Sequence, residues 1–484
     1  MTPAENKRPH GLIILALISA AIAVRVPGLY HDFWLDEIWS LTLVAPLSAP
    51  SQIFTHIHFD LNHWLHSLIL FAIGDHPYWP VYRMPAFAAA CASLLVVASW
   101  PGMQSRRERI LALVAFGASF VLIVYSTEAR GYAWLILFSL LCYRCLLVYG
   151  RSTRPAVAFL FWACAILGFL SQVTFVFVYA ALGLWSLAVF YTASKRLGRT
   201  LCDMLLFFTV PGVFFFWLYV VDIRHVQHGG AGAGTLVGTL VQIAAWMLGT
   251  PAEGWLGGAT FALLIILVAF TSYRMARAGD PAWVLYVGLI TVPVLVAIMT
   301  SRTGFSYWKP RHFIGVAPFF LLLLARGLSV LWGRGRAGPW LAGTVLAVFL
   351  IGNTVRTATF ITQGRGHYLD AMRHIAERTP GGVIEIGSDH DFRNSMVISF
   401  YARYLPDHEV RYVQRDRWVG AGPRWFLVHA QEAGFKPQTT LNNPDSGRRY
   451  ILDAAFTYSG ISGWNWYVYR NGADEADALS PAGP

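Results

Sequence analysis

Long apolar runs recur along this chain from its N-terminus to about residue 360. A helix that crosses a bilayer needs about 20 predominantly apolar residues. Soluble domains carry about 25% charged residues, whereas only 13% of these 484 residues are charged and 56% are hydrophobic. We therefore predict a polytopic α-helical membrane protein and exclude a wholly soluble enzyme. The predicted spans are residues 11–27, 81–101, 110–126, 131–149, 155–171, 173–193, 203–221, 256–273, 281–299, 312–331 and 339–360.

Lys and Arg lie in short clusters between these runs. Clusters of this kind mark the cytoplasmic side of a membrane protein. Eleven spans with a cytoplasmic N-terminus place every cluster inside, provided that the apolar stretches 61–73 and 236–249 are interfacial or re-entrant. The net charge of +11 (37 − 26) is then mainly a topology signal, and we expect no nucleic-acid partner. The clusters are Lys7–Arg8, Arg106–Arg109, Arg151–Arg154, Lys195–Arg199, Arg274–Arg277 and Arg334–Arg336.

The first run has a second interpretation. Residues 11–27 resemble a signal peptide, because Ala21-Ile22-Ala23 is similar to a cleavage site. We prefer an uncleaved first span, since the charge pattern needs a cytoplasmic start. The expected location is the cytoplasmic (inner) membrane, with the C-terminus outside.

The composition changes near residue 361, where charged residues and turn signals become frequent. We predict a transmembrane domain over residues 1–360 and a small extracytoplasmic α/β domain over residues 361–484. Tyr368, Met372 and Ile375 recur at helical spacing within residues 367–378. A strand is predicted at 383–386. Further helix and strand segments are expected at 395–404, 410–413, 425–429 and 465–469.

Unusual polar residues gather in the segments predicted to face outward. Asp36 and Glu37 lie among aromatic residues at the end of the first span. Carboxylates at such a depth are expensive unless they are paired or used, so they are candidate bases, metal ligands or counter-ions. Four histidines near Asp60 offer a possible divalent metal site, with hydrogen bonding to headgroups or acceptor hydroxyls as the alternative. These histidines are His56, His58, His63 and His66.

Two further outward turns carry cations. Glu128 and Arg130 lie in the turn Tyr125–Tyr132, either as a local salt bridge or as an anion clamp held by an acid. Lys309 and Arg311 lie in the turn 301–312, which contains three cations and three aromatics. Cations on the outer side depart from the positive-inside pattern, and such side chains bind phosphate well. Anchoring to lipid headgroups is the alternative for this turn.

In these segments the sequence resembles the bacterial family 39 glycosyltransferases of the GT-C fold, whose relatives include the protein O-mannosyltransferases and the lipid A aminoarabinose transferase. The matching motifs come in family order over about residues 20–330. One departure is Asp60-Leu61-Asn62-His63, where the family usually has an acid followed by His-Pro-Pro-Leu-Tyr. The matching segments are Arg25–Ser40, Gly74-Asp75 with Tyr82–Ala86, Tyr125–Tyr132, Arg311–Pro318 and Ala325–Gly327.

The resemblance implies a membrane glycosyltransferase of the cell envelope. Its donor would be a hexose or pentose on a polyprenyl phosphate, and its acceptor a lipid, glycan or protein at the outer face. Asp36 is then the expected catalytic base, with Glu37 assisting it. The Gly-rich stretch 229–234 is interpreted as a flexible loop over the site. The expected substrate-binding residues are Asp60, His63, Arg83, Glu128, Arg130, Tyr132, Lys309 and Arg311.

Two other functions are compatible with a polytopic chain. A transporter or flippase predicts inverted repeats and charges near mid-span, but no internal repeat is evident and the charges cluster at one face. A polymerase or ligase of lipid-linked glycans shares the lipid-phosphate chemistry. It would typically have a large late outer loop rather than a soluble C-terminal domain.

Overall fold

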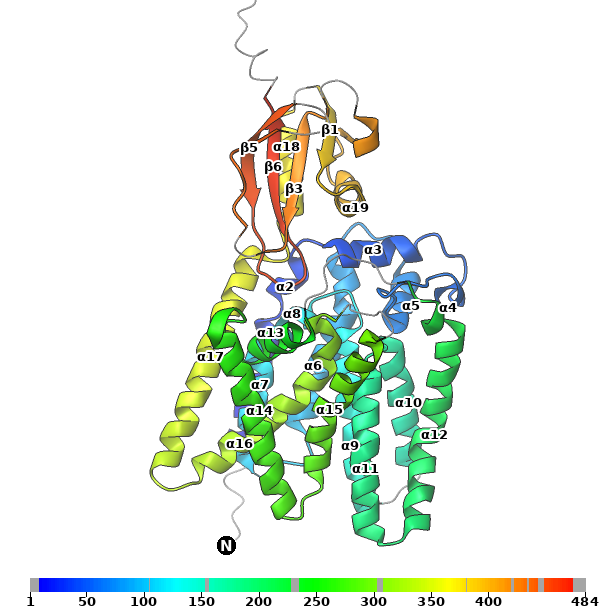
Figure 1. Cartoon of the computed structure of the whole chain (residues 1–484), viewed down its shortest axis with the longest axis vertical. Coiled ribbons are helices and arrows are strands. Elements are labelled where there is room, and N and C mark those ends of the chain that lie inside the picture. Colours follow the sequence, from blue (N-terminus) through cyan, green and yellow to red (C-terminus); the bar gives the residue numbers. More distant parts are fainter. Residues whose placement is uncertain are drawn as a thin grey trace, which may run out of the picture. The chain divides into compact units, whose positions relative to one another are not determined.

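The computed structural model divides into two compact units (Figure 1). One unit comprises Met1–Leu29 and Val44–Thr357, and the other comprises Tyr30–Leu43 and Ala358–Pro484. We refer to them as the helical unit and the sheet unit. The structure describes residues 8–103, 105–152, 156–227, 235–302, 308–379, 381–418, 422–432, 435–442 and 448–472.

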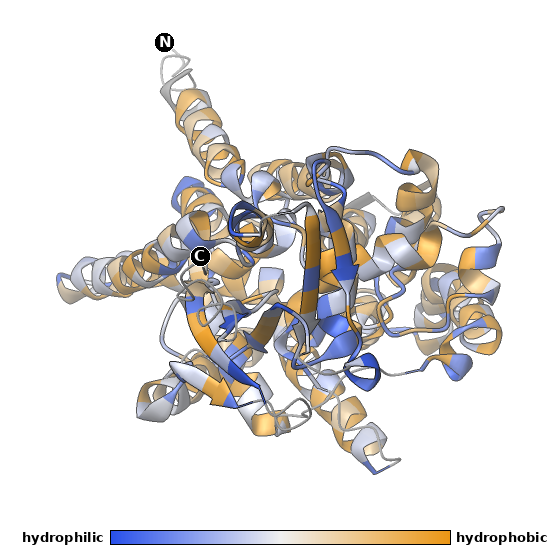
Figure 2. Ribbon diagram, turned by 90° about the horizontal axis from the view of Figure 1, so that it is seen from above, coloured by the Kyte–Doolittle hydropathy of each residue, from blue (hydrophilic) through white to orange (hydrophobic). Residues whose placement is uncertain are grey.

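Nine helical segments in these ranges are long and apolar enough to cross a membrane. In Figure 2 the long helices are coloured as hydrophobic over most of their length, as expected for helices that face lipid or one another. The chain is therefore a predominantly helical, multi-pass membrane protein, as predicted. The main helices of these segments are α1 (Arg8–Ala23), α6 (Pro80–Ala98), α9 (Tyr132–Ser152), α11 (Phe175–Ser194), α12 (Leu197–Val221), α14 (Gly254–Arg277), α15 (Ala282–Ser301), α16 (Ala317–Trp332) and α17 (Ala337–Gln363).

A tenth span is obtained when two short helices are counted together. α7 (Arg106–Ala118) and α8 (Phe120–Ser126) are bent by 59° at Ser119. The amide of Phe120, which lies beyond the bend, donates to Asn353 Oδ1 at 2.8 Å. The predicted span 155–171 corresponds to α10 (Ala156–Ser171), which has only 16 residues. The predicted number of eleven therefore becomes nine or ten by length, with α10 as a shorter apolar helix.

Several helices of the helical unit are too short to span a bilayer. α5 (Trp64–Ile73) has 10 residues and α13 (Leu236–Leu248) has 13, which gives lengths of about 15 and 20 Å against a hydrocarbon core of about 30 Å. They occupy the two stretches for which we predicted no full span. The remaining short elements are α2 (Pro27–Tyr30), α4 (Gln52–Thr55), η1 (Ile223–His225) and η2 (Pro310–Val316).

The sheet unit contains a six-stranded mixed sheet with the order β2-β1-β3-β6-β5-β4. β1 pairs in parallel with β2 and β3, and the other pairings are antiparallel. α18 (Tyr368–Glu377) packs against β5 and β6, while α19 (Asp391–Ala402) packs against β1 and β2 (Figure 1). The expected small α/β domain is confirmed. The strands are β1 (Val383–Ser388), β2 (Glu409–Tyr412), β3 (Trp425–Ala430), β4 (Thr440–Asn442), β5 (Arg449–Phe456) and β6 (Asn465–Asn471).

The segment Tyr30–Leu43 belongs to the sheet unit, although it lies far from that unit in the sequence. It contains most of α3 (Leu35–Val44). Asp32 Oδ2 accepts the backbone N–H of Leu369 at 2.8 Å in the first turn of α18, where helical N–H groups lack partners within the helix. The Tyr401 hydroxyl donates to the Phe33 carbonyl at 2.9 Å, and the rings of Trp39 and Phe392 meet edge to face. Capping and ring packing thus attach the first acidic motif to α18 and α19.

Candidate functional site

The turn between α8 and α9 contains a buried ion pair. Glu128 is 0% and Arg130 is 2% exposed, and Arg130 Nη1 lies 3.5 Å from Glu128 Oε1. The Arg130 backbone N–H also donates to the Glu128 carbonyl at 2.7 Å, so both side chains leave one tight turn. Removing two charges from water costs several kcal/mol for each ion. The structure thus shows the local salt bridge that was one of the two alternatives, and a pair retained at such a cost is a candidate for function.

Gly131 allows this turn to approach two other segments. A Cβ at this position would lie 2.9 Å from His63 Nδ1 and would overlap the carbonyl oxygen of Ser171, at the end of α10. Only glycine therefore fits between the turn, the residue that precedes α5 and the end of α10. This packing brings the ion pair next to His63.

His63 is held by its contacts with two of these elements. Its Nδ1 lies 3.0 Å from the carbonyl oxygen of Ser171, and because a carbonyl only accepts, Nδ1 carries the proton. The His63 ring packs edge to face with Tyr132 at 5.1 Å. Burial lowers the pKa of His63 well below its usual range, the charges of Arg130 and Arg311 lower it further, and the bond to Ser171 opposes them. The imidazole is therefore neutral near pH 7, with a lone pair on Nε2.

Tyr132 connects His63 to the ion pair. The Arg130 guanidinium lies over the Tyr132 ring, 5.0 Å from its centroid, in the geometry of a cation–π interaction. Tyr125 also packs against Tyr132, with the two ring centroids 4.6 Å apart. Four residues predicted as substrate-binding, namely His63, Glu128, Arg130 and Tyr132, thus form one cluster at the ends of α5, α8 and α9.

Arg311 lies in η2 and Lys309 directly precedes it. η2 contacts α9, α11 and α13. Both side chains are partly buried. Thr239 of α13 donates to the Trp308 carbonyl at 3.0 Å, which fixes the start of this element. The charge of Arg311 contributes to the lowered pKa of His63, and η2 packs against α9, the helix that begins at Tyr132. Residues 303–307 of the predicted turn lie outside the described ranges.

Asp60 and Arg83 have backbone contacts. The Asp60 backbone N–H donates to the Gln227 carbonyl at 3.2 Å. Arg83, which is 0% exposed, donates from Nη1 to the carbonyls of Leu29 at 3.0 Å and Gly28 at 3.3 Å. Arg83 therefore fixes the chain just before the first acidic motif. The predicted Gly-rich loop 229–234 follows the Gln227 contact and lies outside the described residues.

A buried aspartate, Asp222, joins two loops next to Asp60. It is 0% exposed, accepts from His58 Nδ1 at 2.5 Å and also accepts from the Trp64 indole N–H. His58 is therefore used to attach the chain before α5 to the end of α12. Within the described ranges, no group of three or more His, Cys, Asp or Glu side chains could hold a metal ion.

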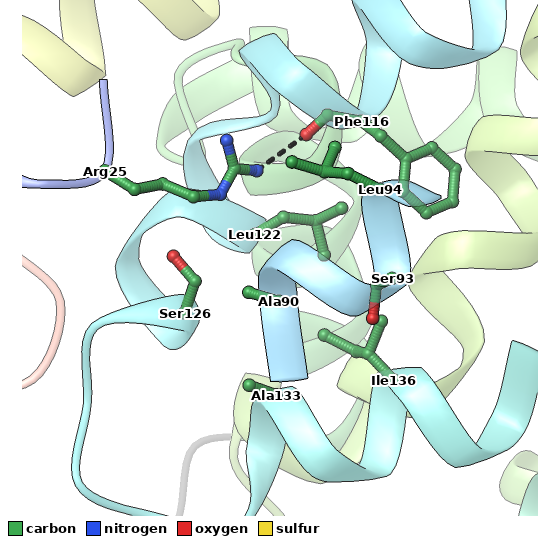
Figure 3. Close-up of a pocket in the computed structure, with 9 residues that line it drawn as sticks. All are labelled: Arg25, Ala90, Ser93, Leu94, Phe116, Leu122, Ser126, Ala133 and Ile136. Atoms are coloured by element: carbon green, nitrogen blue, oxygen red, sulfur yellow. Dashed lines mark hydrogen bonds between the residues drawn. The ribbon is translucent and has the colours of Figure 1, made fainter. Parts of the chain in front are cut away.

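A separate small pocket, with a volume of about 20 Å³, lies between α6, α7, α8, α9 and the turn that follows α1. Figure 3 shows Arg25 reaching toward it, beside Ser93, Ser126 and six apolar side chains. Arg25 donates to the carbonyls of Ala21 at 2.6 Å, Phe116 at 2.8 Å and Gly117 at 3.1 Å. The last two belong to the final turn of α7, whose carbonyls lack helical donors. Arg25 therefore stabilises the bend between α7 and α8.

The two predicted catalytic carboxylates lie in the sheet unit. Asp36 is 7% and Glu37 is 0% exposed, and both lie in the first turn of α3, where a helix dipole favours negative charge. Glu37 Oε2 accepts the Trp34 backbone N–H at 3.4 Å, and Ser40 Oγ donates to the Asp36 carbonyl at 2.7 Å. The other eight predicted residues belong to the helical unit.

Sequence reasoning missed the turn between α10 and α11 and the residue Asp222. Ser171 supplies the carbonyl that binds His63, and Gln172 and Thr174 follow it at 6% and 7% exposure. The available signal was a polar interruption, Ser171-Gln172-Val173-Thr174, between two apolar runs on the side predicted to face outward. Asp222 was detectable as the acid that ends the span 203–221.

The chain is similar to solved membrane-protein structures. It aligns with ArnT from Cupriavidus metallidurans in the apo state at 14% identity, covering 97% of this chain and 99% of that one, with a TM-score of 0.48. The same protein bound to undecaprenyl phosphate gives 14% identity, the same coverage and a TM-score of 0.49. The oligosaccharyltransferase of Archaeoglobus fulgidus in complex with Zn and sulfate gives 11% identity over 86% of this chain and 67% of that one, with a TM-score of 0.49. No protein-family model and no curated protein matches the sequence, so membership of family 39 stays a prediction.

Proposed function

We propose that this protein is a membrane glycosyltransferase that moves a sugar from a polyprenyl-phosphate donor to an acceptor at the outer face of the cytoplasmic membrane. The observation that carries this proposal is the buried Arg130, with Arg311 in the same neighbourhood and helices of membrane-spanning length around them. A lipid phosphate needs cations at the end of an apolar environment, and this cluster fits that need. The motif order in the sequence supports the same class.

The proposed role of the cations is to stabilise the leaving phosphate. When the bond between the anomeric carbon and the phosphate oxygen breaks, its electron pair stays on the phosphate, whose negative charge increases. Donors fixed in a site of low dielectric stabilise such charge more than water does. The proposed donors are Arg130, held by Glu128 and Tyr132, Arg311 of η2, and Lys309, which directly precedes η2.

Asp36 is the proposed base. It takes the proton from the acceptor hydroxyl as that oxygen bonds to the anomeric carbon, so that the products are the glycosylated acceptor and the polyprenyl phosphate. Glu37 is proposed to orient the acceptor, and Asp60 and His63 to bind substrate. Arg83 is proposed to act by holding the chain that leads to Asp36, through its bonds to Gly28 and Leu29.

The organisation of the chain is also part of the proposal. The transmembrane domain of residues 1–360 would bind the lipid-linked donor, and the domain of residues 361–484 would lie outside and help select the acceptor. The attachment of Asp32 and Phe33 to α18 and α19 supports this division of labour. It links the loop of the proposed base to the proposed acceptor-selecting domain.

The proposal is tested by transfer from a labelled undecaprenyl-phosphate sugar in membranes that contain the full chain. Asp36→Asn keeps the size of the side chain and should abolish transfer. The melting temperature of the purified protein should stay that of the wild type. Lys309→Ala and Arg311→Ala should raise the donor concentration needed for half-maximal rate without changing that for the acceptor. Undiminished transfer by Asp36→Asn would exclude it as the base.

A flippase is the competing class for the same lipid chemistry. It would move the labelled lipid across a vesicle bilayer without breaking the sugar–phosphate bond. Appearance of free undecaprenyl phosphate that depends on acceptor supports the transferase. If both the wild type and Asp36→Asn reorient the intact donor, the transferase proposal is wrong and the protein is a flippase.

A further inference from the structure

Three buried polar atoms near the Arg130 cluster have no hydrogen-bond partner among the described residues. They are His63 Nε2, Gln172 Oε1 and Thr174 Oγ1. Their residues are 4%, 6% and 7% exposed, respectively. Buried polar atoms are nearly always satisfied in folded proteins, and each exception needs an explanation such as a ligand or bound water. Other buried polar atoms among the described residues also lack a partner, but these three adjoin the Arg130 cluster, so a ligand of that cluster would satisfy them.

The three atoms belong to two segments that are in direct contact. His63 binds the carbonyl of Ser171 through Nδ1, and Gln172 and Thr174 follow Ser171 in the turn from α10 to α11. Thr174 occupies the N-cap position of α11 but makes no side-chain capping bond there. Its hydroxyl therefore has no structural role in starting the helix.

The chemistry of these atoms selects the kind of group that they can bind. His63 Nε2 presents a lone pair because the proton is on Nδ1, and the Gln172 carbonyl oxygen also only accepts. An oxyanion would be repelled by two such acceptors. An ammonium group would be repelled by the charges of Arg130 and Arg311, which already act on His63. Neutral donors remain, and the neutral donors of a polyprenyl-phosphate sugar are its hydroxyl groups.

We propose that His63, Gln172 and Thr174 form a hydroxyl-binding patch that receives the sugar ring of the lipid-linked donor. This inference rests on the proposed function and extends it from the phosphate to the sugar. In a polyprenyl-phosphate sugar the ring is joined directly to the phosphate. A hydroxyl-binding patch beside Arg130 and Arg311 therefore matches the order of groups in that molecule, and the three residues are specificity determinants for the sugar.

The test compares two probes on the full chain in lipid nanodiscs. Undecaprenyl phosphate reports the phosphate site alone, and undecaprenyl phosphates that carry mannose, glucose, galactose or arabinose report the added sugar. In the wild type at least one sugar should bind more tightly than the bare lipid phosphate. Thr174→Val and Gln172→Leu should each reduce this sugar-dependent gain in affinity by about 3- to 10-fold, which is the effect of one lost hydrogen bond. Affinity for undecaprenyl phosphate should stay unchanged.

The variant His63→Asn distinguishes the contribution of Nε2 from that of Nδ1. The asparagine amide can still donate to the Ser171 carbonyl, as Nδ1 does, but it has no atom in the place of Nε2. The variant should therefore keep the melting temperature close to that of the wild type and lose the sugar-dependent gain by a similar factor. His63→Ala removes both contacts and should lower stability as well.

Ser186→Ala is the matched control. Ser186 is 0% exposed and its Oγ also lacks a partner among the described residues. It lies in the same helix as Phe175, twelve residues (186 − 174) beyond Thr174, or about 18 Å at 1.5 Å per residue. Removing a merely unsatisfied hydroxyl should leave stability equal or higher at both positions. Only Thr174→Val should also alter sugar binding.

The outcomes are distinguishable. If Thr174→Val, Gln172→Leu and His63→Asn all retain the wild-type gain from the sugar, the patch is refuted while the transferase proposal stands. If the wild type binds neither undecaprenyl phosphate nor any of the sugar conjugates, the proposed function fails and the patch fails with it. Methyl glycosides of the same sugars test the acceptor side. A loss of methyl glycoside binding in the variants, with the donor gain intact, would overturn the assignment to the donor.

Discussion

Substituting Gly131 by alanine should destabilise the protein and disturb the His63 site in one step. Gly131 lies between the Arg130 turn, His63 and the Ser171 carbonyl. The added methyl group would lie 2.9 Å from His63 Nδ1 and would overlap a backbone oxygen that no side-chain rotation can move. Either the turn or the end of α10 must therefore shift, and the bond between His63 and Ser171 would be lost.

The magnitude follows from two contributions. Forcing a methyl group into a filled space costs about 1–3 kcal/mol, and leaving the Ser171 carbonyl and His63 Nδ1 without each other costs about 1–3 kcal/mol. The loss of chain freedom in the unfolded state stabilises an alanine variant by about 0.4–1 kcal/mol. We therefore expect Gly131→Ala to lower the free energy of unfolding by about 1–6 kcal/mol.

The measurement is equilibrium unfolding of the purified full chain in mixed micelles, monitored by tryptophan fluorescence. Gly258→Ala is the control, because it is the same substitution inside α14 at a position where a Cβ meets nothing within 4 Å. It should stabilise the helix by about 0.5–1 kcal/mol. Equal unfolding free energies for Gly131→Ala and the wild type would refute the packing of Gly131 against His63 and Ser171.

Two further predictions concern single contacts. Asp32→Ala removes the acceptor for the Leu369 N–H and should lower the stability of α18 by about 1 kcal/mol. The measurement is amide hydrogen exchange, which should become faster in the first turn of α18. Unchanged exchange there would show that the cap contributes nothing. His63 has a lowered pKa in the folded state because of burial and nearby cations, so the unfolded chain takes up its proton first. Stability should therefore fall as the pH drops below about 6.5, by up to about 1.4 kcal/mol per pH unit. His63→Asn should remove that part of the decline, and an equal decline in both proteins would contradict a neutral buried His63.

Much of the architecture was predictable because it depends on local sequence. Every predicted span corresponds to a helix, a bent pair of helices or the short helix α10, since apolar length alone decides where a helix can cross a bilayer. Helix α18 and strand β1 were also expected, and α19, β2, β3 and β6 lie in the segments that were predicted to be ordered without a stated type. β4 and β5 were missed, because β4 has only three residues and β5 exposes part of its length.

The sequence suggested several residues of the candidate site but not their arrangement. The sequence identified Glu128, Arg130 and His63 because charged and titratable groups are rare in an apolar chain. It contained no signal that His63 binds the Ser171 carbonyl, since 108 positions separate them. Such a contact depends on how α5 and α10 pack, and helix packing is decided by surfaces that a single-sequence pattern does not resolve.

Hydrophobic length and the distribution of charge determined by themselves that this chain is helical and multi-pass with a more polar C-terminal portion, because the energies of transfer into a bilayer act on each segment separately. Only the tertiary structure decided that Tyr30–Leu43, with Asp36 and Glu37, belongs to the sheet unit. The physical reason is that this segment is held by contacts with residues more than 300 positions away, through the Asp32 cap on Leu369 and the Tyr401 bond to Phe33. No local preference of the segment encodes those contacts.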